Sequence, residues 1–155
     1  MTATLRKTLL SLLMLLTLPA QALKDDFQNI DPKVEKILSG IDWDQATTIE
    51  VLLQDHDFTP HKLVFSRDKP YILKLKNVGA QAHDMVGGSF FQAIVIKMVN
   101  SSNGRVVTPY LKSVHVRSKH EIDIWFVPMR SGQFDFYCSL PGHQEAGMEG
   151  QVLIR

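Results

Sequence analysis

The feature that most constrains the fold is a strict alternation of apolar and polar residues in the C-terminal third of the chain. The stretch EIDIWFV alternates isoleucine with acidic residues, and QFDFYC alternates Phe134, Phe136 and Cys138 with Asp135 and Tyr137. A period of two is typical of a β-strand with one buried face. Both stretches are therefore predicted to be strands of a sheet that covers a core, with Cys138 facing that core.

Further strand candidates are short and are separated by Pro and Gly residues that favour turns. They are TTIEVLLQD, HKLVFS, YILKLKN and the closing GQVLIR. Short strands with turn signals between them predict an all-β fold, an antiparallel sandwich.

The stretch from 85 to 119 carries mixed signals. In SFFQAIVIKMV, Ser89 and Gln92 stand in capping-box spacing, which favours a helix, whereas the β-branched content favours a strand. We expect a short helix within 85–100, then a turn at NSSNG and a return to strand in RVVTPYLKSVHV.

The N-terminal segment has the pattern of a secretory signal. Arg6 and Lys7 precede the apolar run TLLSLLMLLTL, and Ala20-Gln21-Ala22 fits a cleavage site. The run is shorter than the ~20 residues that a membrane span needs, although an uncleaved anchor is the alternative. The sequence thus predicts a signal peptide over 1–22 and export to the periplasm.

Residues 23–45 are predicted to form a helical extension that covers one end of the domain. Asp31 is the expected N-cap, Pro32 the first helical residue and Gly40 the stop. Residues 46–155 then form one domain, and the mature chain is long enough to bury a core. Without residues 1–22 the chain has 15 basic and 16 acidic residues, a net charge of about −1. This balance gives no electrostatic case for binding nucleic acid or an anionic membrane.

Cys138 is the single cysteine of a chain with an export signal. Exported proteins normally pair their cysteines in disulfides. A lone cysteine is buried and inert, exposed and reactive, paired between chains, or bound to a metal. The end of an apolar strand disfavours a reactive nucleophile, and an ordinary buried thiol is the simplest structural alternative.

The loop after Cys138 contains two further metal donors at equal spacing. In FDFYCSLPGHQEAGMEG, Cys138 is followed after five residues by His143 and after five more by Met148. A thiolate with a thioether favours copper, and imidazole accepts either copper oxidation state. His83, in NVGAQAHDM after the strand YILKLKN, would add a second imidazole from a separate strand end. Two imidazoles, one thiolate and a weak axial thioether form the blue-copper arrangement.

These motifs resemble the cupredoxins, the small blue-copper proteins. The resemblance rests on LKLKNVGAQAHDM and GQFDFYCSLPGHQEAGMEGQVLIR and covers about residues 47–83 and 119–155. It implies a cupredoxin-like Greek-key β-sandwich that holds one type 1 copper ion. The implied ligands are His83, Cys138, His143 and, in the axial position, Met148.

The resemblance also implies a function, a soluble one-electron carrier that cycles between Cu(I) and Cu(II) and is not an enzyme. Electrons in this family usually leave through the exposed edge of the C-terminal histidine, here His143, beside Leu140 and Pro141. We therefore expect transient docking of redox partners near His143, a monomer, and no stable membrane insertion after cleavage. The alternative is copper handling for resistance, delivery or homeostasis at the same site, although the chain lacks a Met/His-rich tail.

Three features depart from the family pattern or stand outside it. Asp84 stands where many cupredoxins place Asn or Ser, which ties the two ligand loops. A carboxylate there would stabilise oxidised copper and lower the potential. The stretch 85–119 has no counterpart in the resemblance, and we expect it to form a flap beside the site. His56 and His61, which flank DFTP, could form a secondary metal site or be surface histidines near a turn.

Overall fold

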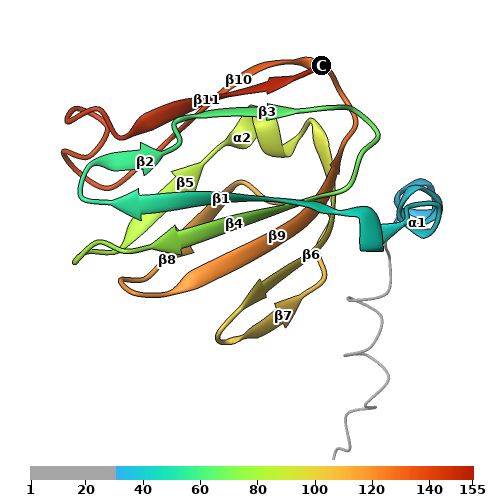
Figure 1. Ribbon diagram of the computed structural model, residues 1–155, viewed down its shortest axis with the longest axis horizontal. Helices are drawn as coiled ribbons and strands as arrows, with labels where there is room; N and C mark the ends of the chain where they lie inside the picture. The colour runs from blue at the N-terminus through green and yellow to red at the C-terminus, as the bar shows by residue number, and fades with distance from the viewer. Residues whose placement is uncertain (1–30) are drawn as a thin grey trace, which may run out of the picture. The chain divides into compact units, whose positions relative to one another are not determined.

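A computed structural model describes residues 31–155 of the chain. The predicted signal peptide over 1–22 and residues 23–30 lie outside the described residues. Within them, two β-sheets pack face to face, and a short helix precedes the strands (Figure 1). The all-β sandwich expected from the strand pattern is confirmed. The domain boundaries at 22/23 and 45/46 are not tested by the structure and stay predictions.

The first sheet has six strands in the order β2-β1-β4-β9-β6-β7. Their bounds are β1 Thr47–Gln54, β2 Asp57–Thr59, β4 Tyr71–Asn77, β6 Ile94–Ser101, β7 Gly104–Val106 and β9 Glu121–Pro128. The second sheet has five strands in the order β3-β11-β10-β5-β8. Their bounds are β3 Lys62–Phe65, β5 His83–Val86, β8 Ser113–Val116, β10 Gly132–Tyr137 and β11 Glu149–Ile154.

Two strand pairs depart from the antiparallel arrangement that the sequence predicts. Strand β1 runs parallel to β4, and β3 runs parallel to β11. Parallel neighbours cannot be joined by a tight hairpin and need a crossover connection. Here the chain passes from β1 through β2 and through β3 of the opposite sheet before it returns in β4, which supplies the crossover.

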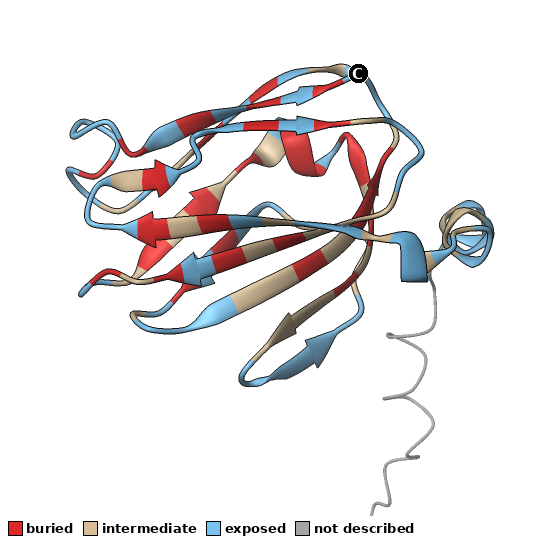
Figure 2. Cartoon of the chain, viewed as in Figure 1, coloured by how far each residue is buried: buried red, intermediate tan, exposed pale blue. Residues whose placement is uncertain are grey.

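The core lies between the sheets, where Figure 2 shows buried segments facing each other. Its centre is aromatic: the Phe65 ring lies 4.9 Å from Tyr71, 5.1 Å from Phe126 and 6.0 Å from Phe90, measured between centroids. Edge-to-face and offset contacts of this kind add to the free energy gained from burial. Large rings therefore hold the two sheets together on the side away from the ligand loops.

The stretch from 85 to 119 belongs to both sheets, so the expectation of a flap was wrong. Strands β5 and β8 pair in one sheet, and β6 and β7 complete the other. A helix is present, but α2 spans only Gly88–Phe91, and its N-cap is Gly87 without a side-chain hydrogen bond. Ser89 therefore does not cap it. The β-branched residues that follow become β6, because pairing with β9 outweighs the helical signal.

The N-terminal helix α1 spans Pro32–Ser39 and has the predicted ends. Asp31 accepts a hydrogen bond from the Lys33 N–H, and Gly40 is the C-cap. The short 3-10 helix η2, Trp43–Gln45, then leads into β1. Trp43 lies 6.2 Å from Trp125 between ring centroids, which fastens the extension to the outer face of β9. Neither helix α1 nor α2 is long and apolar enough to cross a membrane within the part of the chain that the structure describes.

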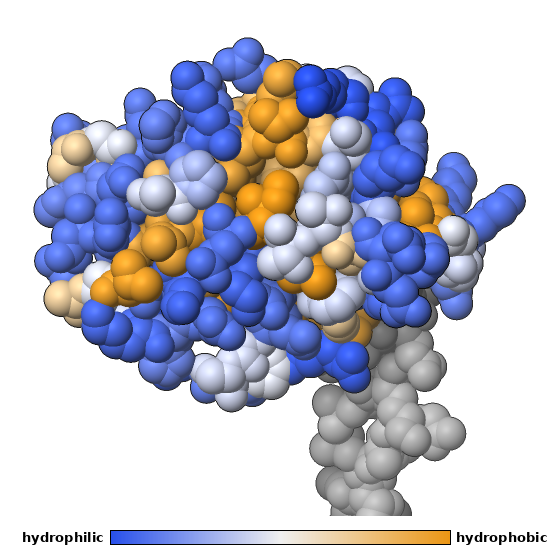
Figure 3. Space-filling model, in the orientation of Figure 1, coloured by the Kyte–Doolittle hydropathy of each residue, from blue (hydrophilic) through white to orange (hydrophobic). Residues whose placement is uncertain are grey.

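The face of the molecule seen in Figure 3 has hydrophilic areas interrupted by apolar patches. Strands β3 and β11 carry one apolar pair, Val64 and Leu153, which lie opposite each other in register. Their side chains are 45% and 43% exposed. Scattered apolar residues of this kind are normal on a soluble surface, and nothing on the described chain covers them.

Candidate metal centre

The four predicted ligands come from two segments, the start of β5 and the β10–β11 loop, at one end of the sandwich. His83 is the first residue of β5, and Cys138 directly follows β10. His143 lies in the β10–β11 loop, and Met148 directly precedes β11. In Figure 1 this loop and the β1–β2 turn lie at the end of the sandwich opposite α1. Strand pairing therefore brings residue 83 to the loop that begins 55 residues later.

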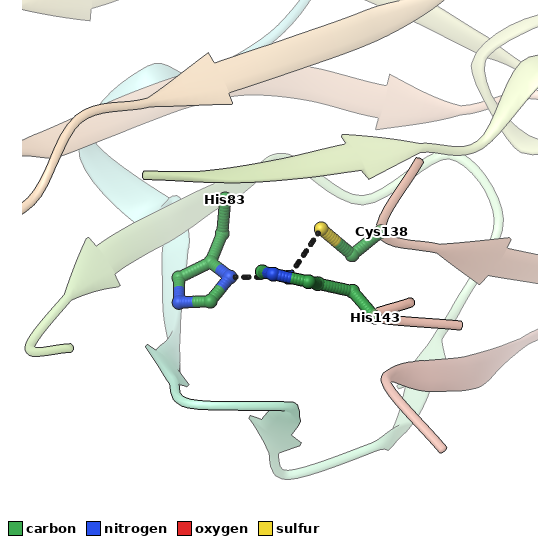
Figure 4. Close-up of side chains that lie close together, drawn as sticks. All are labelled: His83, Cys138 and His143. Carbon is green, nitrogen blue, oxygen red and sulfur yellow. Dashed lines mark hydrogen bonds between the residues drawn. The ribbon is translucent and has the colours of Figure 1, made fainter. Parts of the chain in front are cut away.

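Three of these side chains converge on one point (Figure 4). His143 Nδ1 lies 3.3 Å from His83 Nδ1 and 3.4 Å from Cys138 Sγ. The three ligand atoms all lie within 4.8 Å of one another, and no other such group of His, Cys, Asp or Glu occurs within residues 31–155. All three residues are also buried: His83 and Cys138 are 0% exposed and His143 is 5% exposed.

Met148 is held beside this cluster by the main chain and is fully buried. Its N–H donates to His143 O at 3.0 Å, and its carbonyl accepts from the Cys138 N–H at 3.0 Å. Gly147, at φ 98°, makes the turn that precedes it, in a region that glycine adopts without strain. The loop thus hydrogen-bonds the main chain of Met148 to that of Cys138 and of His143. The axial role of Met148 stays a prediction.

Asp84 connects the segments that carry His83 and Cys138. Its backbone N–H donates to Cys138 Sγ at 3.3 Å, and its Oδ2 accepts from Ser139 Oγ at 2.7 Å. Its Oδ1 lies 2.6 Å from His115 Nδ1 on the neighbouring strand β8. Ser139 and His115 were not predicted as part of the site. Only the pairing of β5 with β8 brings His115 there, and no local sequence pattern indicates that pairing.

The electrostatic environment favours a neutral imidazole at His83. Burial lowers the pKa of His83, and nearby His143 and His56 lower it further, whereas Asp55 and Asp84 oppose the shift. Metal binding requires an unprotonated ring nitrogen. A lowered pKa therefore keeps His83 ready to bind a metal at neutral pH.

The structure does not present an open edge of His143 to solvent. The ring of His56 packs edge-on against it, with 4.9 Å between ring centroids. His56 lies in the exposed β1–β2 turn at φ 66°, a conformation uncommon for a residue with a side chain. His61 instead lines a groove of about 660 Å³ with Asp135 and Glu149. His56 and His61 therefore do not join in a second metal cluster.

The residues present fit one type 1 copper ion. The buried sulfur of Cys138, two imidazole Nδ1 atoms and the buried residue Met148, whose main chain bonds to Cys138 and His143, match the residue types of a trigonal His2Cys set with a weak axial Met. Two unprotonated ring nitrogens 3.3 Å apart would repel each other without a proton or a cation between them. Harder divalent ions such as Mg²⁺ prefer oxygen ligands, which are missing from the described cluster.

Comparisons with known proteins agree with this class of fold. No family model matches the sequence, and no curated protein matches it closely enough to count. Among solved structures, a dithionite-reduced auracyanin from the photosynthetic bacterium Roseiflexus castenholzii superposes with a TM-score of 0.52 at 18% identity, over 71% of this chain and 98% of that one. Auracyanin B superposes with a TM-score of 0.50 at 17% identity, over 72% and 90%.

A multi-copper oxidase from Pseudomonas thermotolerans superposes with a TM-score of 0.60 at 14% identity, over 74% of this chain and 31% of the oxidase. Likenesses at these identities establish the fold and not the activity. The described part of the chain has the cupredoxin fold, and it carries the donor set of a type 1 copper site at the end where the ligand loops meet.

Proposed function

We propose that the protein is an exported one-electron carrier with one type 1 copper. The observation that carries this proposal is the buried convergence of His83, Cys138 and His143, with the buried Met148 bonded through its main chain to Cys138 and His143. Copper supplies, when bound, a one-electron couple between Cu(I) and Cu(II).

The residues around the site would keep its geometry the same in both oxidation states. Main-chain hydrogen bonds join Cys138 to Met148 and Met148 to His143. Asp84 joins the first ligand segment to the second through the thiolate and through Ser139. A site held by several segments has little freedom to rearrange, and electron transfer is faster when little rearrangement is needed. The Asp84 N–H also stabilises negative charge on the sulfur.

Location and partners follow from the sequence and remain part of the proposal. Residues 1–22 would direct export to the periplasm, where the protein would act as a monomer without nucleic acid or membrane insertion. A redox partner would dock transiently at the His143 end of the sandwich. Because His56 covers His143, this contact would include the β1–β2 turn. Small interfaces are typical of such encounters.

Copper loading tests the proposal directly. Purified protein is loaded with Cu(II), and its visible and EPR spectra are recorded. We expect intense thiolate-to-copper absorption that disappears in Cys138→Ser, because serine cannot supply the thiolate. Tyr137→Phe, one residue away on the other face of β10, is the matched control and should keep the absorption. A colourless copper-loaded wild type would rule the proposal out.

A second measurement separates electron transfer from copper handling. An electron carrier should exchange electrons with a small redox protein while it retains Cu(I) against a chelator. Rapid loss of Cu(I) to the chelator, with slow electron exchange, would instead support the alternative of copper delivery. The burial of the ligands favours retention.

A further inference from the structure

The ring of His83 has a second nitrogen without a protein partner. Nδ1 faces His143, whereas Nε2 is buried and makes no hydrogen bond within residues 31–155. Figure 4 shows that this nitrogen lies on the side of the ring away from His143. An imidazole that binds a metal through Nδ1 carries its proton on Nε2. Such a proton is nearly always donated to a carboxylate, a carbonyl or water, because an unpaired buried donor costs free energy.

The absence of a side chain at Gly79 lets one possible acceptor approach this nitrogen. A Cβ atom placed on Gly79 would lie 3.1 Å from His83 Nε2 and 2.9 Å from Asp55 Oδ1. Both atoms therefore approach the same side of Gly79, where no side chain separates them. The Asn77 amide oxygen lies 3.3 Å from the same point, but it already accepts the Gly79 N–H. Asp55 supplies the charged acceptor.

The main chain fastens these residues together. Asp55 and His56 form the two-residue turn between β1 and β2, whose flanking residues Gln54 and Asp57 pair in register. Leu53, at the end of β1, accepts hydrogen bonds from the N–H groups of Val78 at 2.9 Å and Gly79 at 3.3 Å. The turn that carries Asp55 is thus anchored to the loop that borders His83.

We propose that Asp55 is a positioning residue of the metal centre, whose carboxylate accepts the Nε2 proton of His83 when Nδ1 binds copper. The hydrogen bond would fix the orientation and the tautomer of the ring. The negative charge would also favour Cu(II) over Cu(I) and lower the reduction potential. This inference rests on the copper site proposed above. It assigns a function to a turn residue that lies far from every predicted ligand in the sequence.

Redox titration of the copper-loaded full chain is the first test. Asp55→Asn and Asp55→Ala should both raise the potential, because both remove the negative charge, while the thiolate-to-copper absorption remains. In the diamagnetic Cu(I) form, NMR should detect a slowly exchanging His83 Nε2 proton. This proton should exchange severalfold faster with solvent in Asp55→Ala. If Asp55 had only a structural role, its substitution would not change both the reduction potential and the exchange rate of the His83 Nε2 proton.

Gly79→Ala tests the same geometry with Asp55 still in place. The new Cβ would stand closer to Asp55 Oδ1 than side chains tolerate, and the buried His83 ring cannot move away. The exposed carboxylate must therefore swing out. We expect the potential and the proton exchange to shift in the same direction as in Asp55→Ala.

Asp57→Asn is the matched control, since it also removes a carboxylate from the β1–β2 hairpin. The Asp57 carboxylate accepts a hydrogen bond from Thr59 Oγ1. The substitution should leave the potential close to the wild-type value.

An equal shift in Asp57→Asn would show a general charge effect and overturn the inference. Unchanged potential and proton exchange in the Asp55 variants would overturn it as well, while intense copper absorption in those proteins would leave the proposed function standing. Failure of the wild type to form that absorption would instead contradict the proposed function.

Discussion

Asp84 and Ser139 link the two ligand-bearing segments, because Asp84 Oδ2 accepts a 2.7 Å hydrogen bond from Ser139 Oγ. Residue 84 therefore makes the tie that many cupredoxins make with Asn or Ser, but with a carboxylate. The same carboxylate lies 2.6 Å from His115 Nδ1 through its other oxygen. Substitutions at residue 84 can separate the effect of the hydrogen bond to Ser139 from the effect of the negative charge.

Asp84→Asn should raise the reduction potential, because it removes a negative charge while its amide oxygen can still accept from Ser139. A shift on the order of 60 mV would correspond to a tenfold change in the Cu(II)/Cu(I) ratio. Asp84→Ala should raise the potential and also change the visible spectrum, since the tie is lost. Redox titration with spectra of each form measures both effects. An unchanged potential in Asp84→Asn would remove the charge of Asp84 from the account.

His56→Gly should speed electron self-exchange severalfold, because it uncovers the His143 ring and shortens the closest approach of a partner. Glycine adopts the φ of 66° at this position without strain, so the turn should be preserved. NMR line broadening in mixtures of Cu(I) and Cu(II) protein measures the rate. His61→Ala, which removes an imidazole from a nearby groove, should leave it unchanged. Slower exchange in His56→Gly would show that His56 conducts electrons rather than covers His143.

The copper-free protein should lose stability in mild acid. Burial lowers the pKa of His83 in the folded state, while the unfolded chain retains a value near 6.5. Below about pH 6.5 the unfolded state then binds more protons, so the free energy of unfolding falls until the pH reaches the folded pKa. Denaturant unfolding between pH 7.5 and 5 measures this slope. His83→Phe should reduce the slope, and an equal slope in that variant would assign the effect to other groups.

Gly150→Ala should destabilise the sandwich by about 1–3 kcal/mol, the usual cost of overpacking a core. A Cβ at Gly150 would lie 2.3 Å from Phe136 Cζ and 2.5 Å from His61 O. Gly40→Ala, where the nearest atoms lie at 3.6 and 3.7 Å, is the control and should change stability by less than about 1 kcal/mol. Thermal and denaturant unfolding of both variants decides the comparison. Equal stability of Gly150→Ala and wild type would mean that β10 and β11 can separate at little cost.

The local spacing of residues was sufficient to predict most strands and the ligand loop. An alternation of period two predicted β9 and β10, and it placed Cys138 on the buried face with Phe136. The equal spacing of Cys138, His143 and Met148 lies within one loop, so it depends on few distant contacts. The sequence predicted these features because they depend on residues that are neighbours along the chain.

Tertiary structure decided the features that depend on which strands pair. Strand β1 pairs in parallel with β4, and residues 94–101 form a strand that pairs with β9. No local sequence pattern indicates which strands would pair in this way. The same holds for the surroundings of the metal centre. His115 reaches Asp84 only through β8, and the β1–β2 turn brings Asp55 toward His83 and His56 onto His143. The sequence by itself determined which donors are present. Strand pairing and turn position decided which charges and rings surround them, because these contacts join residues far apart in the chain.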